Sequence, residues 1–451
     1  MPIELSQTVS TPVSALDQDK DKRSPGNWDN PPVARRNFFL GVANGFLFNT
    51  SETLLDPVLV LVAFVSHLTQ SPFLLGLIVP IRDGAWWLPQ LWVSGYLQSK
   101  PNKLAIYRRT SVLRIAAWFC IALSINLVHD PVLLLPLFFI VYVISSISNG
   151  IAGLPFLEVV AKTIPPQRRG EFFAWRMGLG GLGAIAASLL VRWAIDPGSF
   201  LKYPYNFGLL AFLYFIGASV SLLIFNRVDE KDDHQTQPVL SLKSQIIKGI
   251  KVAKSDFNYR DYMIMQSALI ISGAGIPFFA IYVQRSFNVP PNLIGVYLFT
   301  LATSSFVANY FFGRLSRFMG YRKVMLMAAV AGIIMYILVI LLTLISEISI
   351  IPTLWASYWL IPVFIFSGFR STGIGVAGNS LLIELSPVSD RSLYLGFTNS
   401  ILGLVLLSTC VLGLVVEVLG FEIIFIICLF FNLISLYAIY VLIRRKLVIG
   451  S

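Results

Sequence analysis

Long apolar runs alternate with short polar segments along almost the whole chain. A helix that spans the hydrocarbon core of a bilayer needs about 20 apolar residues. Twelve runs reach that length, and none shows the strict alternation over about ten residues that is typical of a transmembrane β-strand. We therefore predict an all-α membrane protein with twelve transmembrane helices. The predicted spans are 38–65, 73–97, 104–128, 132–160, 171–195, 206–227, 262–284, 292–316, 323–346, 352–385, 393–418 and 421–443.

One polar segment is much longer than the others and divides the spans into six plus six. Its second part places Leu242, Ile246 and Ile250 at helical spacing with lysines between them, which predicts an amphipathic helix on the membrane surface. The chain is thus expected to have four regions. These are a disordered cytoplasmic tail (1–36), an N-terminal six-helix bundle (37–227), a cytoplasmic linker (228–258) and a C-terminal six-helix bundle (259–446).

Two pairs of loops resemble each other at a separation of about half the chain. Gly95-Tyr-Leu97 follows the second span, and Gly313-Arg-Leu315 follows the eighth span 218 residues later. Arg169 and Arg391, which follow the fourth and tenth spans, are 222 residues apart. A period of this size, placed at corresponding loops, predicts that the two six-helix bundles are pseudo-symmetric.

Lysine and arginine are concentrated on one side of the predicted membrane. Of the 34 Lys and Arg residues, 27 fall in the tail, the linker and the loops on the same side, whereas the loops on the other side hold only Lys202. Because cytoplasmic loops carry the excess of basic residues, both termini are expected in the cytoplasm. The net charge of +11 then faces anionic lipid headgroups, and no nucleic-acid partner is expected.

The composition excludes several classes of protein. With 56% hydrophobic and 13% charged residues, a soluble enzyme is not expected. The chain has no ATPase phosphate-binding loop and no convincing nucleophile–base pair, so ATP-driven transport and enzymatic activity are not expected either. The cysteines lie in apolar runs and the histidines are scattered, which predicts no metal and no cofactor. We expect a monomeric, multi-pass protein of a bacterial plasma (inner) membrane, with the lipid bilayer as its surroundings.

The loop after the eighth span reads Gly313-Arg-Leu-Ser-Arg-Phe-Met-Gly320-Tyr-Arg322-Lys323. With the six-plus-six spans and the long central loop, it resembles the major facilitator superfamily, whose signature loop has the form Gly-x-Leu-x-Asp-x-x-Gly-x-Arg/Lys-Arg/Lys. The resemblance covers about residues 37–446. Arg317 stands where the family has the acid that helps to lock the inner gate. The resemblance implies a twelve-helix secondary transporter whose gate residues include Gly313, Arg317, Gly320 and Arg322.

Four charged residues lie deep in the first two spans. An ionisable side chain at that depth is costly unless it faces a cavity or a partner. Glu52 and Asp56 are four residues apart on one helix face, and Pro57 predicts a kink beside them. Arg82 and Asp83 follow in span 2, and Arg82 lies as deep as Asp56, at roughly 13 Å. We predict an Asp56–Arg82 pair that leaves Glu52 or Asp83 to bind a proton; the alternative is a static network tying the two spans together.

Arg370 lies near the middle of span 10 without an acid within four residues. By the resemblance, it faces the central cavity from the half opposite to Glu52. It is expected to contact a substrate anion or Glu52, and the alternative is a structural ion pair between the halves. Glu158 and Arg176, near the inner ends of spans 4 and 5, are predicted to form a gate or hairpin pair. Arg114 is expected to reach outward to the membrane surface, so it is left out of the site.

Several uncharged polar or aromatic residues lie at similar depths, and four are candidates for contacting a small amphipathic organic solute. The packing of large aromatic side chains is the alternative for the tryptophan. The four candidates are Asn49, Trp86, Gln284 and Asn379.

The function predicted from these residues is secondary active transport of a small organic solute by alternating access, with proton coupling as a hypothesis. A first alternative is facilitated diffusion or efflux without proton coupling. A second alternative is a non-transporting scaffold that delivers pigment or lipid to a membrane complex, which would tolerate the altered gate loop. A membrane enzyme ranks third because catalytic residues are lacking.

Overall fold

The computed structural model describes residues 31–98, 100–165, 168–232, 242–348, 351–387 and 391–449. Within these ranges the chain forms helices and short connections without any β-strand, so the predicted all-α class is confirmed. The helices are α2 (Pro31–Leu54), α3 (Val60–Leu68), α4 (Pro72–Gly76), the π-helix η2 (Pro80–Gly84), α5 (Ala85–Trp87), α6 (Gln90–Gln98), α7 (Leu104–Leu127), α8 (Pro131–Thr163), α9 (Arg169–Ile195), α10 (Tyr205–Phe225), α11 (Leu242–Ser255), α12 (Phe257–Gly273), α13 (Ile276–Phe287), α14 (Leu293–Met319), α15 (Tyr321–Ile348), α16 (Thr353–Leu385), α17 (Arg391–Ser408), α18 (Val411–Leu419) and α19 (Phe421–Ile449).

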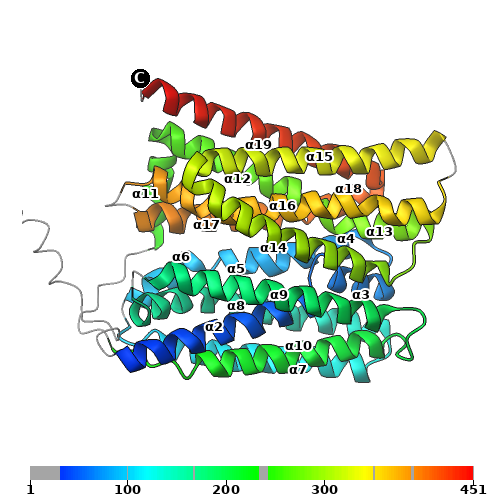
Figure 1. Ribbon diagram of the computed structural model, residues 1–451, viewed down its shortest axis with the longest axis horizontal. Helices are drawn as coiled ribbons and strands as arrows, with labels where there is room; N and C mark the ends of the chain where they lie inside the picture. The colour runs from blue at the N-terminus through cyan, green and yellow to red at the C-terminus, as the bar shows by residue number, and fades with distance from the viewer. Residues whose placement is uncertain are drawn as a thin grey trace, which may run out of the picture.

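The helices form two bundles that lie side by side (Figure 1). Helices α2 to α10 make the N-terminal half, and helices α12 to α19 make the C-terminal half. Helix α11 lies at one end of the molecule, which we call the α11 end, and α2 begins and α19 ends there as well (Figure 1). The other end is called the opposite end.

Ten helical segments of the described chain are long and apolar enough to cross a membrane. The first two predicted spans, 38–65 and 73–97, are not among these ten segments, and both are divided into shorter helices. The ten segments and these two divided spans together agree with the twelve predicted crossings. The boundaries differ in detail, since α2 already begins at Pro31, inside the region predicted as a tail. The rest of that tail, residues 1–30, lies outside the described residues.

The first span is interrupted between α2 and α3 at the predicted kink. Pro57 has no backbone N–H to donate, which breaks the helical ladder. The Oδ1 atom of Asp56 accepts hydrogen bonds from the backbone N–H groups of Val58 (3.0 Å) and Leu59 (2.8 Å). The carboxylate therefore caps the first turn leading into α3.

The second span is divided into α4, η2, α5 and α6. Pro80 opens the π-helical turn η2, which carries Arg82 and Asp83. A π-helical turn widens the backbone and changes the direction of the side chains that it carries. Trp86 follows in α5 and packs against α8, where a Cβ atom added to Gly150 would lie 2.5 Å from the carbonyl oxygen of Ala85. The close approach of α5 to α8 thus depends on that glycine.

The seventh span is interrupted in the same manner as the first. Helix α12 ends at Gly273, and α13 begins at Ile276 with Pro277 in its first turn. Pro277 follows Pro57 by 220 residues, which matches the period that the loops predicted. The fourth helix of each half, α8 and α16, has 33 residues. These correspondences agree with the predicted pseudo-symmetry of the two halves.

The apolar core is joined at one end of the molecule and divided at the other. At the opposite end, a single cluster contains buried residues of both halves, such as Val62 and Phe279. At the α11 end, each half has its own cluster, around Phe172 in the N-terminal half and around Tyr262 in the C-terminal half. The halves are therefore packed together at the opposite end and separated at the α11 end.

The linker contains the predicted amphipathic helix as α11. Ile247 and Ile250 are exposed on its surface, while Gly249 is buried against Phe397 of α17. The linker residues 233–241 lie outside the described chain.

Candidate functional site

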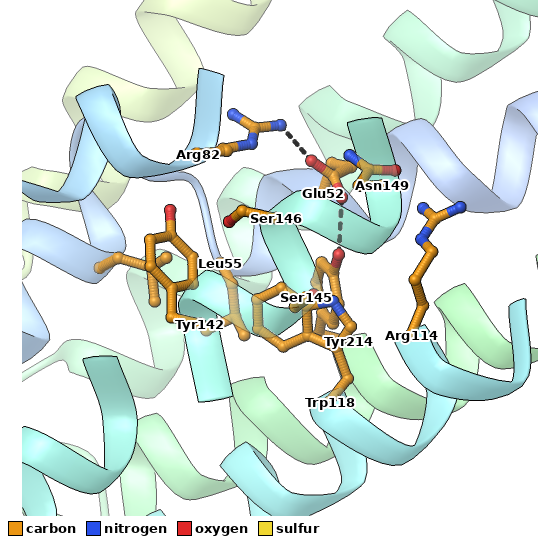
Figure 2. A pocket seen from close by; sticks show the side chains of 11 residues that line it. Glu52, Leu55, Arg82, Arg114, Trp118, Tyr142, Ser145, Ser146, Asn149 and Tyr214 are labelled. Atoms are coloured by element: carbon orange, nitrogen blue, oxygen red, sulfur yellow. Dashed lines mark hydrogen bonds and ion pairs between the residues drawn. The ribbon is translucent and has the colours of Figure 1, made fainter. Parts of the chain in front are cut away.

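A polar cluster lies inside the N-terminal half, where Glu52 of α2 has a donor on each carboxylate oxygen (Figure 2). The Nη2 atom of Arg82, from η2, forms an ion pair with Oε2 of Glu52. The hydroxyl of Tyr214, from α10, donates to Oε1 at 2.6 Å. Three helices of one half are thus tied together through a single carboxylate.

The predicted pair between Asp56 and Arg82 is not found. The carboxylate of Asp56 is used as a cap by the backbone of the interrupted helix, whereas Glu52, one turn earlier, faces Arg82. The second acid near the guanidinium is Asp83, whose Oδ1 lies 4.0 Å from Nε of Arg82. Arg82 is therefore shared between Glu52 and Asp83.

A cavity of about 20 Å³ adjoins this cluster. That volume is on the order of what one water molecule needs, so no organic solute fits there. Arg114 lines the cavity and is only 5% exposed, so the expectation that it reaches outward is wrong (Figure 2). The guanidinium lies over the ring of Phe48, 5.3 Å from its centroid. The other residues that line this small cavity are Glu52, Leu55, Leu61, Arg82, Trp118, Tyr142, Ser145, Ser146, Asn149 and Tyr214.

A much larger cavity, of about 800 Å³, lies between the two halves on the side of the α11 end. Helix α9 forms one wall and α14 forms the facing wall, and the cavity extends inward to the C-terminal turns of α2. Asn49, Gly313 and Arg317, three of the residues singled out from the sequence, line it. The other lining residues are Thr53, Phe173, Ala174, Met177, Gly178, Gly180, Gly181, Ala184, Ala302, Ser305, Phe306, Asn309, Tyr310, Arg314 and Thr372.

A third cavity, of about 260 Å³, also lies between the halves. Asp83 lines it from the N-terminal half and Arg370 lines it from the C-terminal half. Arg370 does not contact Glu52, because its Nη2 donates to the carbonyl oxygen of Leu269 (2.5 Å) and to Oγ of Ser272 (2.7 Å) in α12. Arg370 therefore lies at the interface of the halves, as predicted, but it does not make the predicted contact with Glu52.

The remaining solute-binding candidates do not gather around these cavities. Trp86 packs on α8, and a Cβ atom at Gly153 would lie 2.7 Å from its ring. Gln284 lines a separate cavity of about 380 Å³ at the opposite end. Asn379 is exposed on α16 and lines none of the cavities described above.

The predicted gate pair between Glu158 and Arg176 is not found. Nη1 of Arg176 donates to the carbonyl oxygen of Gly41 (2.9 Å) and to Oδ1 of Asn44 (2.6 Å), which ties α9 to α2. Glu158 is exposed and makes no ion pair with any residue in the described ranges. Arg176 thus has one backbone and one side-chain acceptor on α2 in place of the predicted carboxylate.

The segment predicted as the gate loop is largely helical: Gly313 and Arg317 lie in the last turns of α14, Arg322 lies in the first turn of α15, and Gly320 joins the two helices. Gly320 has a φ of +77°, a conformation that favours glycine and turns the chain from α14 into α15. Nη2 of Arg322 lies 3.7 Å from Oε1 of Glu384, which links α15 to α16 within one half. Arg317, in the position of the family acid, is exposed at the mouth of the large cavity.

Among the described residues, three hydrogen bonds join the halves at the opposite end, where the joined apolar core also lies. They are the hydrogen bonds from Asn292 to Oδ2 of Asp196 (2.9 Å), from Ser71 to Oε2 of Glu417 (3.0 Å) and from Arg285 to the carbonyl oxygen of Gln70 (3.3 Å).

The side chain of Asn292 and the backbone N–H of Gly198 donate to Asp196 and hold the pKa of its carboxyl below the ordinary value. Hydrogen bonds to the charged form are the cause, so this contact is made by an ionised carboxylate.

The separation at the α11 end is one-sided. Helices α6 and α17 remain in contact, and Nδ2 of Asn399 donates to Oε1 of Gln90 at 2.8 Å. On the other side, α9 and α14 meet near the opposite end, as Arg192 does with Gly295, but enclose the large cavity nearer the α11 end. The halves thus part between α9 and α14.

Some residues of the site were not foreseen from the sequence. Arg114 carried a signal, since it is charged in the middle of a span, but the side that it faces depends on the rotation of α7. Tyr214 and Tyr142 carried none, because a tyrosine in an apolar run reads equally well as packing.

A sequence model described as the Major Facilitator Superfamily matches residues 41–346 and, in a second match, residues 262–448. Together the two matches cover nearly the whole chain. No curated protein sequence matches it significantly.

Solved structures of transporters share the fold. The nucleoside transporter NupG has a TM-score of 0.66 and 14% identity, over 91% of this chain and 99% of that one. A D-xylose-proton symporter has a TM-score of 0.67 and 14% identity, over 91% and 97%. A POT family transporter in complex with 5-aminolevulinic acid has a TM-score of 0.67 and 13% identity, over 93% and 96%. The chain belongs to the major facilitator superfamily, and it is a multi-pass membrane transporter, not an enzyme.

Proposed function

We propose that the protein is a secondary transporter that moves a small organic solute by alternating access. One observation carries this proposal: the apolar core is shared by both halves at the opposite end and divided at the α11 end, with a cavity of about 800 Å³ in the division. A solute can enter such a cavity from one side only. Release on the other side requires the halves to rock about the central region.

The orientation follows from charge. The tail, the linker and the loops predicted on one side carry 27 of the 34 Lys and Arg residues, and the described helices that border these segments end at the α11 end. An excess of basic residues is typical of the cytoplasmic side. The α11 end is therefore assigned to the cytoplasm, together with both termini, and the conformation is inward-open. A bacterial inner membrane, with its anionic lipids, suits this charge.

The polar contacts that close the opposite end can be broken at a low cost. The described ones are the three hydrogen bonds given above, and water replaces a lost hydrogen bond at a net cost of about 1 kcal/mol. Within each half, by contrast, buried contacts such as the bond from Asn44 to the hydroxyl of Ser221 (2.7 Å) hold the helices together. Rigid halves joined by breakable contacts are what alternating access requires.

Proton coupling is the finer part of the proposal. Glu52 and Asp83 share one guanidinium, that of Arg82, and the adjoining cavity holds no more than about one water molecule. A movement of Arg82 toward one carboxylate leaves the other to bind a proton. Asp56 and Arg114 also lie nearby, and they set the background charge of the cluster.

The coupling hypothesis is tested by uptake into proteoliposomes at several values of external pH. Glu52→Gln keeps the shape of the side chain and removes its titration, so pH-dependent uptake should be lost. Unchanged pH dependence in Glu52→Gln and in Asp83→Asn would leave transport without proton coupling as the mechanism. Glu158→Gln, an exposed position outside the cavities, is the matched control.

Alternating access is tested by locking the closed end. In a chain that lacks Cys120, Cys410 and Cys428, the pair Asp196→Cys and Asn292→Cys is linked with a short bis-methanethiosulfonate, which joins the two thiols through reducible disulfides. The link should abolish solute movement in proteoliposomes, and a reductant should restore it.

The matched control for this lock pairs His129→Cys with Tyr205→Cys. These residues contact each other at the opposite end within the N-terminal half, 3.2 Å apart, so a link between them leaves the rocking free. Transport that continues with the halves linked would contradict alternating access. A reconstituted protein that moves no solute from a metabolite panel would favour the scaffold alternative.

A further inference from the structure

We propose that the cavity between Asp83 and Arg370 binds a small zwitterion, with one carboxylate, one ammonium group and an apolar body, as in an α-amino acid. This inference rests on the proposed transport function and names the substrate class. Among the described residues that line the cavity, Asp83 and Arg370 are the only charged ones, and no ion pair joins them.

Arg370 is a buried cation that lacks a carboxylate partner. It is 4% exposed, and its contacts go to a backbone carbonyl and a hydroxyl, both through Nη2. Within the described ranges, its Nε atom has no hydrogen-bond partner and no carboxylate forms an ion pair with it. A buried charge without a counter-ion is costly, and a guanidinium matches a carboxylate in both charge and planar geometry. The cavity beside Arg370 is thus suited to an anionic group.

Asp83 supplies the opposite charge from the other half. Its side chain is 46% exposed, although it lies deep in the second span, so the cavity is what exposes it. Its ion-pair contact is at the 4.0 Å limit, to an Arg82 whose Nη2 is already paired with Glu52. A carboxylate has capacity for about four hydrogen bonds, and most of that capacity faces the cavity.

The remaining walls suit an uncharged body of limited size. Trp87 and Phe278 are the aromatic residues of its lining, and the interruption between α12 and α13 places two small residues, Gly273 and Ala274, in the wall. The volume of about 260 Å³ lies below the roughly 300–1,000 Å³ of pockets for drug-sized ligands. A molecule of the size of an amino acid fits that description.

A single charge satisfies only one side of this cavity. An anion alone would pair with Arg370 but face the Asp83 carboxylate, and a cation alone would face the reverse problem. A zwitterion pairs with both and adds no net charge to the membrane interior. Because the two side chains belong to different halves, the bound molecule also bridges the halves, so its binding favours their approach.

The experiment measures binding to the purified full-length protein by isothermal titration calorimetry. The probes are L-phenylalanine and its two single-charge analogues, 3-phenylpropanoate and 2-phenylethylamine, with L-leucine, 4-methylpentanoate and 3-methylbutylamine as a second set. A lost charge-assisted hydrogen bond weakens affinity by about tenfold or more. The amino acids should therefore bind at least about tenfold more tightly than either analogue.

Two variants assign the charges to the residues. Asp83→Asn should remove the preference for L-phenylalanine over 3-phenylpropanoate and keep the preference over 2-phenylethylamine. Arg370→Gln should do the converse, and Arg370→Lys, which keeps the charge, covers the case in which that variant fails to fold. Glu158→Gln, with the same loss of charge at an exposed position, should bind as the parent does.

The outcomes separate this inference from the proposed function. Equal binding of an amino acid and one of its analogues, or no binding of either amino acid, overturns the zwitterion site even where proteoliposomes move another solute. Binding of L-phenylalanine without its movement across proteoliposomes supports the site and overturns transport of this substrate class.

Discussion

The centres of the two halves share a backbone design and differ in chemistry. In both, the first span is interrupted beside a proline, Pro57 in one half and Pro277 in the other. In the N-terminal half, the interruption is surrounded by a network of carboxylates, arginines and a tyrosine. In the C-terminal half, one arginine, Arg370, binds a backbone carbonyl and a serine. The repeat has kept the break in the helix and has divided the charges between the halves.

This division places charge and space in different parts of the molecule. The N-terminal cluster encloses space for about one water molecule. The larger cavities lie between the halves, where each half contributes one side. In the proposed mechanism, the solute contacts both halves, whereas the proton is bound by residues of the N-terminal half.

The comparison predicts that the N-terminal centre depends on its charges more than the C-terminal centre does. Arg82→Gln leaves Glu52 without its cation, which should lower the free energy of unfolding by roughly 3–5 kcal/mol, the range for breaking a buried ion pair. Unfolding in detergent measures the change. The double variant with Glu52→Gln should recover part of the loss; a double variant as unstable as Arg82→Gln would contradict the pairing.

A second contrast concerns the fourth helix of each half. Gly150→Ala in α8 should cost about 3 kcal/mol, because the added methyl group meets backbone atoms of α5 that cannot move aside. Gly375→Ala in α16 meets nothing within 4 Å and should stabilise the helix by about 0.5–1 kcal/mol. Thermal unfolding of the two variants side by side checks both signs, and equal effects would mean that α5 does not approach α8 closely.

Two buried tyrosines make the comparison finer. Tyr214 donates to the charged Glu52, and Tyr336 donates to the backbone carbonyl of Ser272. Tyr214→Phe should cost about 2 kcal/mol and Tyr336→Phe about 1 kcal/mol, since hydrogen bonds to charged groups are the stronger. Equal decreases in the free energy of unfolding for the two variants would contradict the proposed electrostatic difference between the halves.

The smallest effect concerns pH at the closed end. The pKa of Asp196 lies below its ordinary value of 3.8, so its contact with Asn292 is fully present above that value and is lost as the pH falls through the lowered pKa. Closure should therefore be constant between about pH 5 and 8 and weaken only in strong acid. The opening of this end is measured by the rate of thiol labelling at Gln284→Cys in a chain without other cysteines. The labelling rate should rise in strong acid, and this rise should be absent when Asp196→Asn is added.

Much of the fold followed from the sequence because membrane crossing imposes simple rules. The length of apolar runs gave the helices, Pro57 gave the first interruption, and the spacing of loop motifs gave the repeat. The division of span 2 was not foreseen, although Pro80 and Pro89 lie in it, because proline is tolerated in membrane helices.

The candidate site was foreseen as a set of charges but not as a set of partners. Which acid pairs with Arg82 depends on the rotation that the π-helical turn adds to the backbone, and no pattern in the sequence reports it. For Arg176, backbone carbonyls compete with carboxylates as acceptors, and a residue-by-residue reading sees only the carboxylates. The depth of a residue in the membrane can be calculated from its position along a helix, whereas the direction in which its side chain points depends on how the helix packs.

The contact of α6 with α17 keeps the halves together on one side of the molecule, whereas on the other side they are separated between α9 and α14. Trp175 and Leu182 of α9 are exposed and line a groove next to this separation. We therefore expect that a compound dissolved among the lipid tails can approach the large cavity from the side, between α9 and α14, without first crossing into water. Partitioning into the lipid leaflet raises the concentration of an apolar inhibitor beside α9 and α14. Apolar inhibitors should therefore compete with the solute more effectively than their aqueous concentrations suggest.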